Sequence, residues 1–291
     1  MKDTVAVKAE NSSEPVTSGF QEILLLDVWQ VLRARWFWGY SLLFAGLIVV
    51  LFTMGVTESQ IIGFIGLSRL MVTFIQICIA VIPIFVLITT VRSVVGERET
   101  LVLEYMLSLP VSFKEYFWGK FVGRFLVVFF PVFISLLGAV VWGTFKQLDI
   151  PWDLFSLYSF LLAAMIIYFL GLGMFLSTVV RSQEMGLSVG FVVWILMVAF
   201  LDIILLGLML KTRIDPGIVI GTAMLNPLQV FRTAAMALFD PKLTVLGPAS
   251  YYILDTISRS GFIAYAILYP VITGLFWAWL GYWFFSRTDS I

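Results

Sequence analysis

The chain has 291 residues, of which 61% are hydrophobic and 12% charged, and its formal net charge at pH 7 is zero. Soluble domains carry roughly 25% charged residues, so this composition excludes a soluble enzyme or binding module and predicts an integral membrane protein. The apolar residues form continuous runs instead of alternating with polar ones, which favours membrane-spanning helices over a barrel.

The residue types that are missing exclude several chemistries. The sequence has no histidine, which excludes bis-histidine haem, the usual zinc sites and histidine proton relays. Its only cysteine, Cys78, lies in an apolar run, so it cannot form a disulfide within one chain and is interpreted as a packing residue. No GxxxxGKS/T phosphate-binding loop occurs, so any ATP must be hydrolysed by another chain. We predict no catalytic residue, metal ligand or cofactor in this chain, and no nucleic-acid partner.

The N-terminal region divides into a tail and a helix. Residues 1–19 are polar and mixed in charge, which predicts a disordered tail in the cytoplasm. Ser18 and Gln21 then have the spacing of a helix-starting capping box. Apolar side chains recur at near-helical spacing through residues 20–35, which predicts an elbow helix lying at the membrane interface; they are Phe20, Leu24, Val28 and Val31. The alternative is that this segment simply extends the first span.

Six apolar stretches are long enough to cross a membrane. A bilayer core about 30 Å thick requires about 20 apolar residues in a helix. The stretches that meet this length are 36–56, 70–91, 119–143, 157–180, 185–210 and 262–285. The sequence therefore predicts an all-α membrane protein in which residues 20–291 form one transmembrane domain of six spans.

The distribution of basic residues predicts the orientation of these spans. Lysine and arginine gather at one set of span ends, which marks the cytoplasmic side. This predicts that both termini and residues 92–118 are cytoplasmic and that the segments 57–68, 144–156 and 211–261 are periplasmic. Asp202, roughly 26 Å along the predicted fifth span, is interpreted as an interfacial carboxylate near the outer headgroups and not as an ion-coupling site.

The strongly polar interruption at residues 91–120 contains two predicted helices and a corner. One stripe of the first helix is apolar and another is polar; the apolar stripe is Val102, Leu103, Met106 and Leu109, and the polar stripe is Glu97, Glu104 and Ser108. Pro110 ends this helix, and Ser112 with Glu115 forms a capping box that starts the next one. An ordinary interfacial loop is the alternative.

Within this interruption the sequence resembles type-2 (ABC-2) ABC transporter permeases. The residues that carry the resemblance are Gly96-Glu97-Arg98-Glu99, Leu101, Glu104, Leu107-Ser108-Leu109-Pro110-Val111-Ser112, Glu115 and Gly119-Lys120. A second similarity, to the short cytoplasmic turn of the family, covers Gly171-Leu172-Gly173, Ser177 and Val180-Arg181-Ser182.

The resemblance implies a non-catalytic permease of the bacterial inner membrane. It implies a homodimer in contact with membrane lipid, carrying two cytoplasmic ATPase subunits that bind ATP and Mg²⁺. It further implies that residues 97–109 form a coupling helix, with the ATPase groove contacted by Glu97, Glu99, Leu101, Glu104 and Leu107.

The predicted outer segment 211–261 is broken by prolines and contains a short helix at residues 227–238. In type-2 permeases the equivalent region forms re-entrant helices of the outer gate. A surface that docks a periplasmic protein is the alternative role, and for either role the candidate residues are Asn226, Pro227, Phe231 and Arg232. These residues resemble the NosY group, permeases of the ABC complex that assists copper-centre maturation of nitrous oxide reductase. That resemblance implies a transmitter of motion that binds no metal itself.

Three other functions remain open at this stage. The permease could export a small-molecule or lipid-like substrate. An ATP-independent secondary carrier is disfavoured by the few charges in the spans and by the absence of a visible inverted repeat. A structural membrane anchor of an enzyme complex would not require the capped corner.

Overall fold

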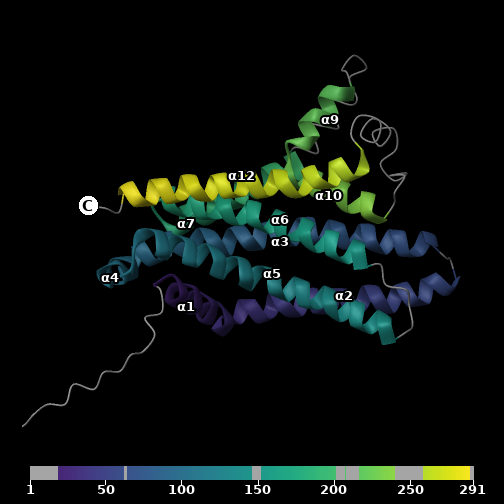
Figure 1. Ribbon diagram of the computed structural model, residues 1–291, viewed down its shortest axis with the longest axis horizontal. Coiled ribbons are helices and arrows are strands. Elements are labelled where there is room, and N and C mark those ends of the chain that lie inside the picture. The colour runs from purple at the N-terminus through teal and green to yellow at the C-terminus, as the bar shows by residue number, and fades with distance from the viewer. Residues whose placement is uncertain are drawn as a thin grey trace, which may run out of the picture.

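The computed structural model describes residues 19–61, 64–145, 152–200, 207, 216–239 and 258–288, and these residues form helices joined by short turns. In chain order the helices are α1 (Gly19–Arg33), α2 (Arg35–Ile61), α3 (Phe64–Glu99), α4 (Val102–Ser108), α5 (Phe113–Phe145), α6 (Trp152–Val179), α7 (Gln183–Ile195), α9 (Pro216–Met224), α10 (Pro227–Phe239) and α12 (Arg259–Thr288), with a π turn, η1 (Leu196–Phe200), after α7. The long helices lie side by side in an elongated bundle, with α4 at one end and α9 projecting near the other (Figure 1).

Within the part of the chain that the structure describes, four helices are long and apolar enough to cross a membrane. They are Phe74–Glu99, Phe113–Gly138, Trp152–Val179 and Arg259–Arg287, and they match four of the predicted spans. The predicted first and fifth spans correspond to shorter apolar helices, Arg35–Val50 and Gln183–Ala199. Asp202 and the N-terminal tail lie outside the described residues.

A helix covers most of the predicted elbow segment, but its buried face differs from the prediction, and Ser18 of the predicted capping box lies outside the described residues. Helix α1 ends at Arg33, and a bend at Ala34 separates it from α2. The buried side chains are Ile23, Asp27 and Val31, whereas Leu24 and Val28 are only half-buried. The stripe rotates toward Asp27 because that carboxylate has a cationic partner on α5, which a pattern of apolar residues cannot reveal.

Glycines allow the closest helix contacts in the bundle. A Cβ atom on Gly171 of α6 would lie 1.9 Å from the carbonyl oxygen of Gly274 in α12, so these two backbones touch. On α5, a Cβ atom at Gly119 would lie 3.0 Å from the Ile23 side chain, and one at Gly123 would lie 3.2 Å from the Asp27 carboxylate. The α5 glycines therefore let α1 lie flat against α5.

Candidate functional site: the corner around helix α4

The corner begins with a break that the sequence did not predict. Instead of one helix over residues 97–109, α3 ends at Glu99 and α4 begins at Val102. Between them Leu101 has a φ of 59° and a ψ of 9°, a left-handed conformation that costs a non-glycine residue roughly 1–2 kcal/mol. Glu97 and Glu99 therefore belong to the last turn of α3 and not to the short helix.

The far side of the corner follows the prediction closely. Leu109 is extended, as the residue before a proline tends to be, and ends α4 ahead of Pro110. The Ser112 Oγ accepts a hydrogen bond from the Glu115 backbone N–H at 3.2 Å, and the Glu115 carboxylate accepts one from the Ser112 backbone N–H at 2.9 Å. This reciprocal pair is the predicted capping box, and it starts α5.

Helix α4 turns one face inward and leaves the other free. Leu103 and Met106 are buried against the bundle, as predicted for the apolar stripe. The prediction was wrong for Val102 and Leu109, which are about 40% exposed. Val102 is the first residue of the seven-residue helix and Leu109 is extended beyond its end, so the two side chains do not share the buried face of Leu103 and Met106. We define the α4 face as the exposed side chains Leu101, Val102, Glu104, Tyr105 and Leu109; Leu107 is half-buried beside it.

Glu97 turns inward instead of facing outward with Glu104. Its carboxylate forms an ion pair with Lys120 on α5 and accepts a hydrogen bond from the Tyr116 hydroxyl. The Lys120 side chain is 1% exposed and its ammonium lies 5.1 Å from the centre of the Tyr116 ring. The predicted polar stripe thus divides, because Glu97 has a buried cation opposite it whereas Glu104 has none among the described residues.

A second ion pair lies one turn further along α5. The Arg124 Nε donates to both carboxylate oxygens of Asp27 at 3.1 Å, and its Nη1 donates to the backbone carbonyl of Thr89 at 2.5 Å. The Asp27 side chain is fully buried. We call Asp27, Glu97, Lys120 and Arg124 the buried charge cluster: two cations on α5 are matched by carboxylates on α1 and α3, so the cluster is neutral and joins three helices.

The sequence analysis missed this cluster. Its signal was the regular spacing of Lys120 and Arg124, four residues apart at the start of an otherwise apolar helix. Charges at that position destabilise the fold unless they are paired, so the spacing indicates two carboxylate partners elsewhere in the chain.

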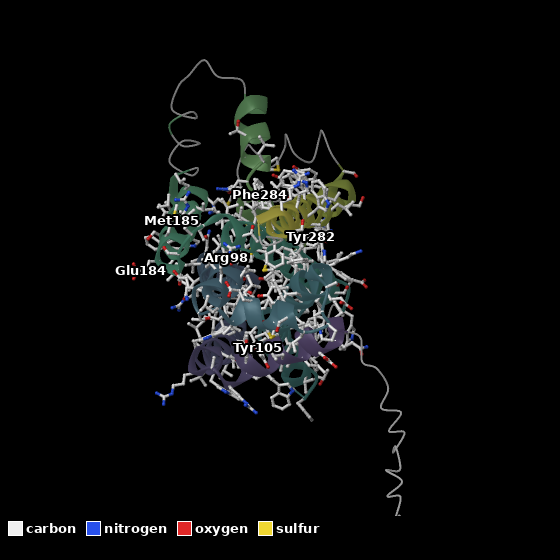
Figure 2. All side chains as sticks on the ribbon, turned by 90° about the vertical axis from the view of Figure 1, so that its left-hand side faces the viewer. Arg98, Tyr105, Glu184, Met185, Tyr282 and Phe284 are labelled. Atoms are coloured by element: carbon white, nitrogen blue, oxygen red, sulfur yellow. The ribbon has the colours of Figure 1, made fainter. Side chains whose placement is uncertain are left out.

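The turn between α6 and α7 completes this end of the molecule. The Glu99 carboxylate accepts a hydrogen bond from the Gln183 backbone N–H at 3.2 Å, and the Gln183 side-chain oxygen accepts one from the Arg92 Nε at 3.3 Å. The Ser177 hydroxyl oxygen accepts bonds from the backbone N–H groups of Val94 and Val95. In an end-on view α3, α4, α7 and α12 each contribute side chains to this end, including Arg98, Tyr105, Glu184 and Tyr282 (Figure 2).

The residues predicted for the outer gate or partner lie away from α4 and are largely internal. Asn226 is 3% exposed; its side chain donates to the Met197 carbonyl at 2.9 Å and accepts from the Leu228 backbone N–H at 3.0 Å, so it caps α10 and ties that helix to η1. Phe231 is buried near Tyr158, and Arg232 is half-buried. Pro227 is the first residue of α10, which confirms the helix predicted at residues 227–238.

Two tyrosines from α12 fix the turn before α10. The hydroxyl groups of Tyr265 and Tyr269 donate to the carbonyl oxygens of Met224 and Leu225 at 2.9 and 2.6 Å. Among the described residues there is no group of three or more cysteine, aspartate or glutamate side chains that could hold a metal ion.

Comparison with known proteins identifies the family of the chain. A family model described as "ABC-2 family transporter protein" matches residues 21–290. The chain is 26% identical over 227 residues to the "Probable ABC transporter permease protein NosY" of Stutzerimonas stutzeri, an alignment covering 75% of this chain and 82% of that protein. It is 23% identical over 215 residues to the protein of the same name from Pseudomonas aeruginosa, covering 72% and 78%. The apolar helical bundle and the match over nearly its whole length together assign the chain to the ABC-2 transporter family, as a membrane-embedded permease subunit similar to the NosY permeases.

Proposed function

We propose that this permease couples ATP hydrolysis by a separate cytoplasmic ATPase to a conformational change across the bacterial inner membrane. In this proposal the subunit has six spans, works as a homodimer, keeps both termini in the cytoplasm and docks one ATPase against the α4 face of each copy. The ATPase supplies the bound ATP and Mg²⁺. Family membership supports the existence of an ATPase partner.

The observation that carries the proposal is the way α4 is built. Leu103 and Met106 anchor the helix to the bundle, while Glu104 and the 67% exposed Tyr105 project from it. After α4, the capping box of Ser112 and Glu115 starts α5. Before α4, the end of α3 is joined to α5 by the buried charge cluster, which also joins α5 to α1. A displacement of α4 would therefore be passed to the long helices α3 and α5 and to α1 instead of being absorbed by a flexible loop.

The role of the glutamates differs in this proposal from the expectation raised by the family resemblance. Glu104 is the acidic residue available to a cationic rim of the ATPase, with Leu101 and Tyr105 as apolar contacts and Leu107 beside them. Glu97 acts from inside, as part of the buried charge cluster, and Glu99 holds the α6–α7 turn through Gln183.

The test is co-purification of the ATPase with variants of the α4 face. The double variant Glu104→Lys, Tyr105→Ala should lose the ATPase, because charge reversal and loss of the aromatic contact act at the centre of the face. Asp153→Lys is the matched control: it makes the same charge reversal at an exposed site in the first turn of α6, which lies at the opposite end of α6 from the α6–α7 turn. Equal recovery and equal stimulation of the ATPase with the wild type, the double variant and Asp153→Lys would refute docking at α4.

We further propose that the motion reaches a periplasmic partner, as in maturation of a copper enzyme such as nitrous oxide reductase. Similarity to two NosY permeases supports this role. The chain would act as a transmitter and not as a copper carrier, because its sequence has no histidine and one cysteine. In this proposal the segment 211–261 binds the partner, and within it Asn226 and Phe231 fix α10 to the bundle.

The export of a lipid-like substrate is the competing function. Deleting residues 239–251 should abolish periplasmic partner binding while leaving ATPase assembly intact. Movement of lipid or drug across vesicles by the purified permease and ATPase, with no other protein present, would support export and contradict the transmitter role.

A further inference from the structure

A groove on the side of the bundle combines an apolar wall with a cationic end. It has a volume of about 620 Å³, within the range of roughly 300–1,000 Å³ typical of ligand pockets. Its apolar wall is formed by Ala80, Ile84, Phe85 and Ile88 of α3, Trp36 of α2 and Trp194 of α7, and its polar end by Gln30, Arg92 and Arg124. Neither the family resemblance nor the α4 face accounts for this groove.

Both tryptophans of the wall have a contact to α3 that does not depend on a ligand. The Trp36 ring packs edge-on against Phe85 with 5.2 Å between ring centres, and the Trp194 indole donates a hydrogen bond to the Ala80 carbonyl at 3.2 Å. Both large aromatic side chains are therefore held in place at the sides of the groove, and an occupant would not have to order them.

The polar end carries an unneutralised positive charge. The charge of Arg124 is balanced by Asp27, whereas Arg92 is exposed and its one bonded partner among the described residues is the neutral amide oxygen of Gln183. Arg35, next to Trp36, is also exposed. An anionic group at this end would complete the hydrogen bonding of the Arg92 guanidinium, which suits phosphate well.

The length of the groove matches one leaflet of a membrane. Ala80 and Arg92 are twelve positions apart on α3, which corresponds to about 18 Å of helix, while half of a bilayer core is about 15 Å. The whole stretch falls within the membrane-spanning part of α3, with Arg92 toward the α4 end. Basic pockets between spans are typical sites for anionic lipid headgroups.

We propose that this groove binds an anionic phospholipid of the surrounding membrane, with one acyl chain along the Trp36–Trp194 wall and the phosphate at Arg92. The bound lipid would fill the gap between α1, α3 and α7, next to the helices that meet at the buried charge cluster. The site is separate from ATPase docking, since Arg92 is not part of the α4 face, and the two proposals can fail independently.

Lipid binding can be measured by native mass spectrometry of the full chain in non-ionic detergent, titrated with phosphatidylglycerol or phosphatidylcholine of identical acyl chains. The wild-type chain should prefer phosphatidylglycerol, and Arg92→Gln should reduce that preference roughly five- to tenfold. Arg181→Gln, the same change at an exposed arginine in the α6–α7 turn, should leave the preference unaltered. Ile84→Trp, which fills the apolar part, should weaken the binding of both lipids.

Two outcomes would overturn the proposal. An unchanged lipid preference in Arg92→Gln would show that the cationic end does not select the headgroup. Efficient disulfide cross-linking between two copies carrying Ile88→Cys, with Cys78 replaced by alanine, would show that a second copy of the chain covers the groove. Since Arg92 and Arg181 are surface residues, their variants keep the test valid even if Ile84→Trp fails to fold.

Discussion

Lys120 is the side chain whose surroundings best explain how the corner is held. It is almost completely buried, and its ammonium contacts the Glu97 carboxylate and lies 5.1 Å from the centre of the Tyr116 ring. Removing one member of a buried ion pair leaves the other charge without a partner in a medium of low dielectric constant, which costs more than the pair itself contributes. Under the proposed function, stability and coupling to the ATPase would therefore depend on the same contact.

Replacing Lys120 with methionine should lower the free energy of unfolding by about 3–5 kcal/mol, because Glu97 loses its cation. The double variant Lys120→Met, Glu97→Gln should recover a large part of this loss, since no charge stays buried. Thermal unfolding in detergent measures the loss in the single variant and the recovery in the double variant. Lys114→Met is the control: it lies at an exposed position in the first turn of α5 and should change the free energy of unfolding little. If the single and double variants are equally unstable, the pair is not coupled.

Leu101, in contrast to Lys120, destabilises the isolated chain, because its backbone is strained and its side chain is 62% exposed. Leucine gains little from packing here, yet glycine would adopt the left-handed conformation without steric strain. Strain that persists at an exposed position is typical of functional sites. The leucine side chain is therefore expected to serve contact with the ATPase and not the stability of the isolated permease.

Leu101→Gly should accordingly stabilise the isolated chain by roughly 0.5–1 kcal/mol and weaken ATPase binding at the same time. Thermal unfolding and co-purification of the same preparation would measure the two effects. A variant that is less stable but binds the ATPase normally would contradict the assigned role. Val102→Ala, the neighbouring exposed position, serves as the control for loss of an apolar side chain without relief of strain.

At the scale of the helices, α6 is the central element, and it packs most extensively against α12 and α3. The contact between Gly171 and Gly274 is a backbone-to-backbone approach that no side chain permits. Small residues at such crossings let membrane helices gain dispersion energy where lipid provides no hydrophobic driving force between them.

Gly171→Ala should separate α6 from α12 and destabilise the protein by about 3 kcal/mol, because the new methyl group would overlap the Gly274 carbonyl. Gly190→Ala on α7 is the matched control: its Cβ atom would lie 3.6 Å from the nearest side chain, an ordinary contact. The free energy of unfolding of the control should stay within about 1 kcal/mol of the wild-type value. Thermal unfolding that ranks the two variants equally would contradict the close crossing.

For the whole molecule, the orientation in the membrane is the prediction with the widest consequences. The α4 corner and the α10 region lie toward different ends of the bundle (Figure 1), so a permease that transmits motion requires them on opposite sides of the bilayer. The positive-inside rule assigns the α4 end to the cytoplasm.

Single cysteines at Thr100 and at Lys242, in a chain with Cys78 replaced by alanine, should react with a membrane-impermeant thiol reagent from opposite sides. Intact cells should label only the Lys242→Cys protein, and permeabilised cells should label both. Asp153→Cys, in the first turn of α6, should behave like Lys242→Cys. Labelling of Thr100→Cys and Lys242→Cys from the same side would refute the topology, the assignment of the ATPase side and the transmitter role together.

The sequence by itself determined the features that depend on neighbouring residues. Hydropathy located the long apolar helices, Pro110 marked the end of α4, and the capping box of Ser112 with Glu115 and the start of α10 at Pro227 followed from interactions within three or four positions. Such local interactions are fully encoded in short stretches of chain.

Only the tertiary structure decided which polar residues are buried. Asp27 and Arg124 are 97 positions apart, and Glu97 and Lys120 lie on different helices, so neither pair follows from local periodicity. The same limit explains why Glu97 was predicted on the outer face with Glu104, and why the left-handed Leu101 between them was missed. A charge can be buried only where a distant helix supplies its partner, and that condition is met by packing and not by the pattern of one helix.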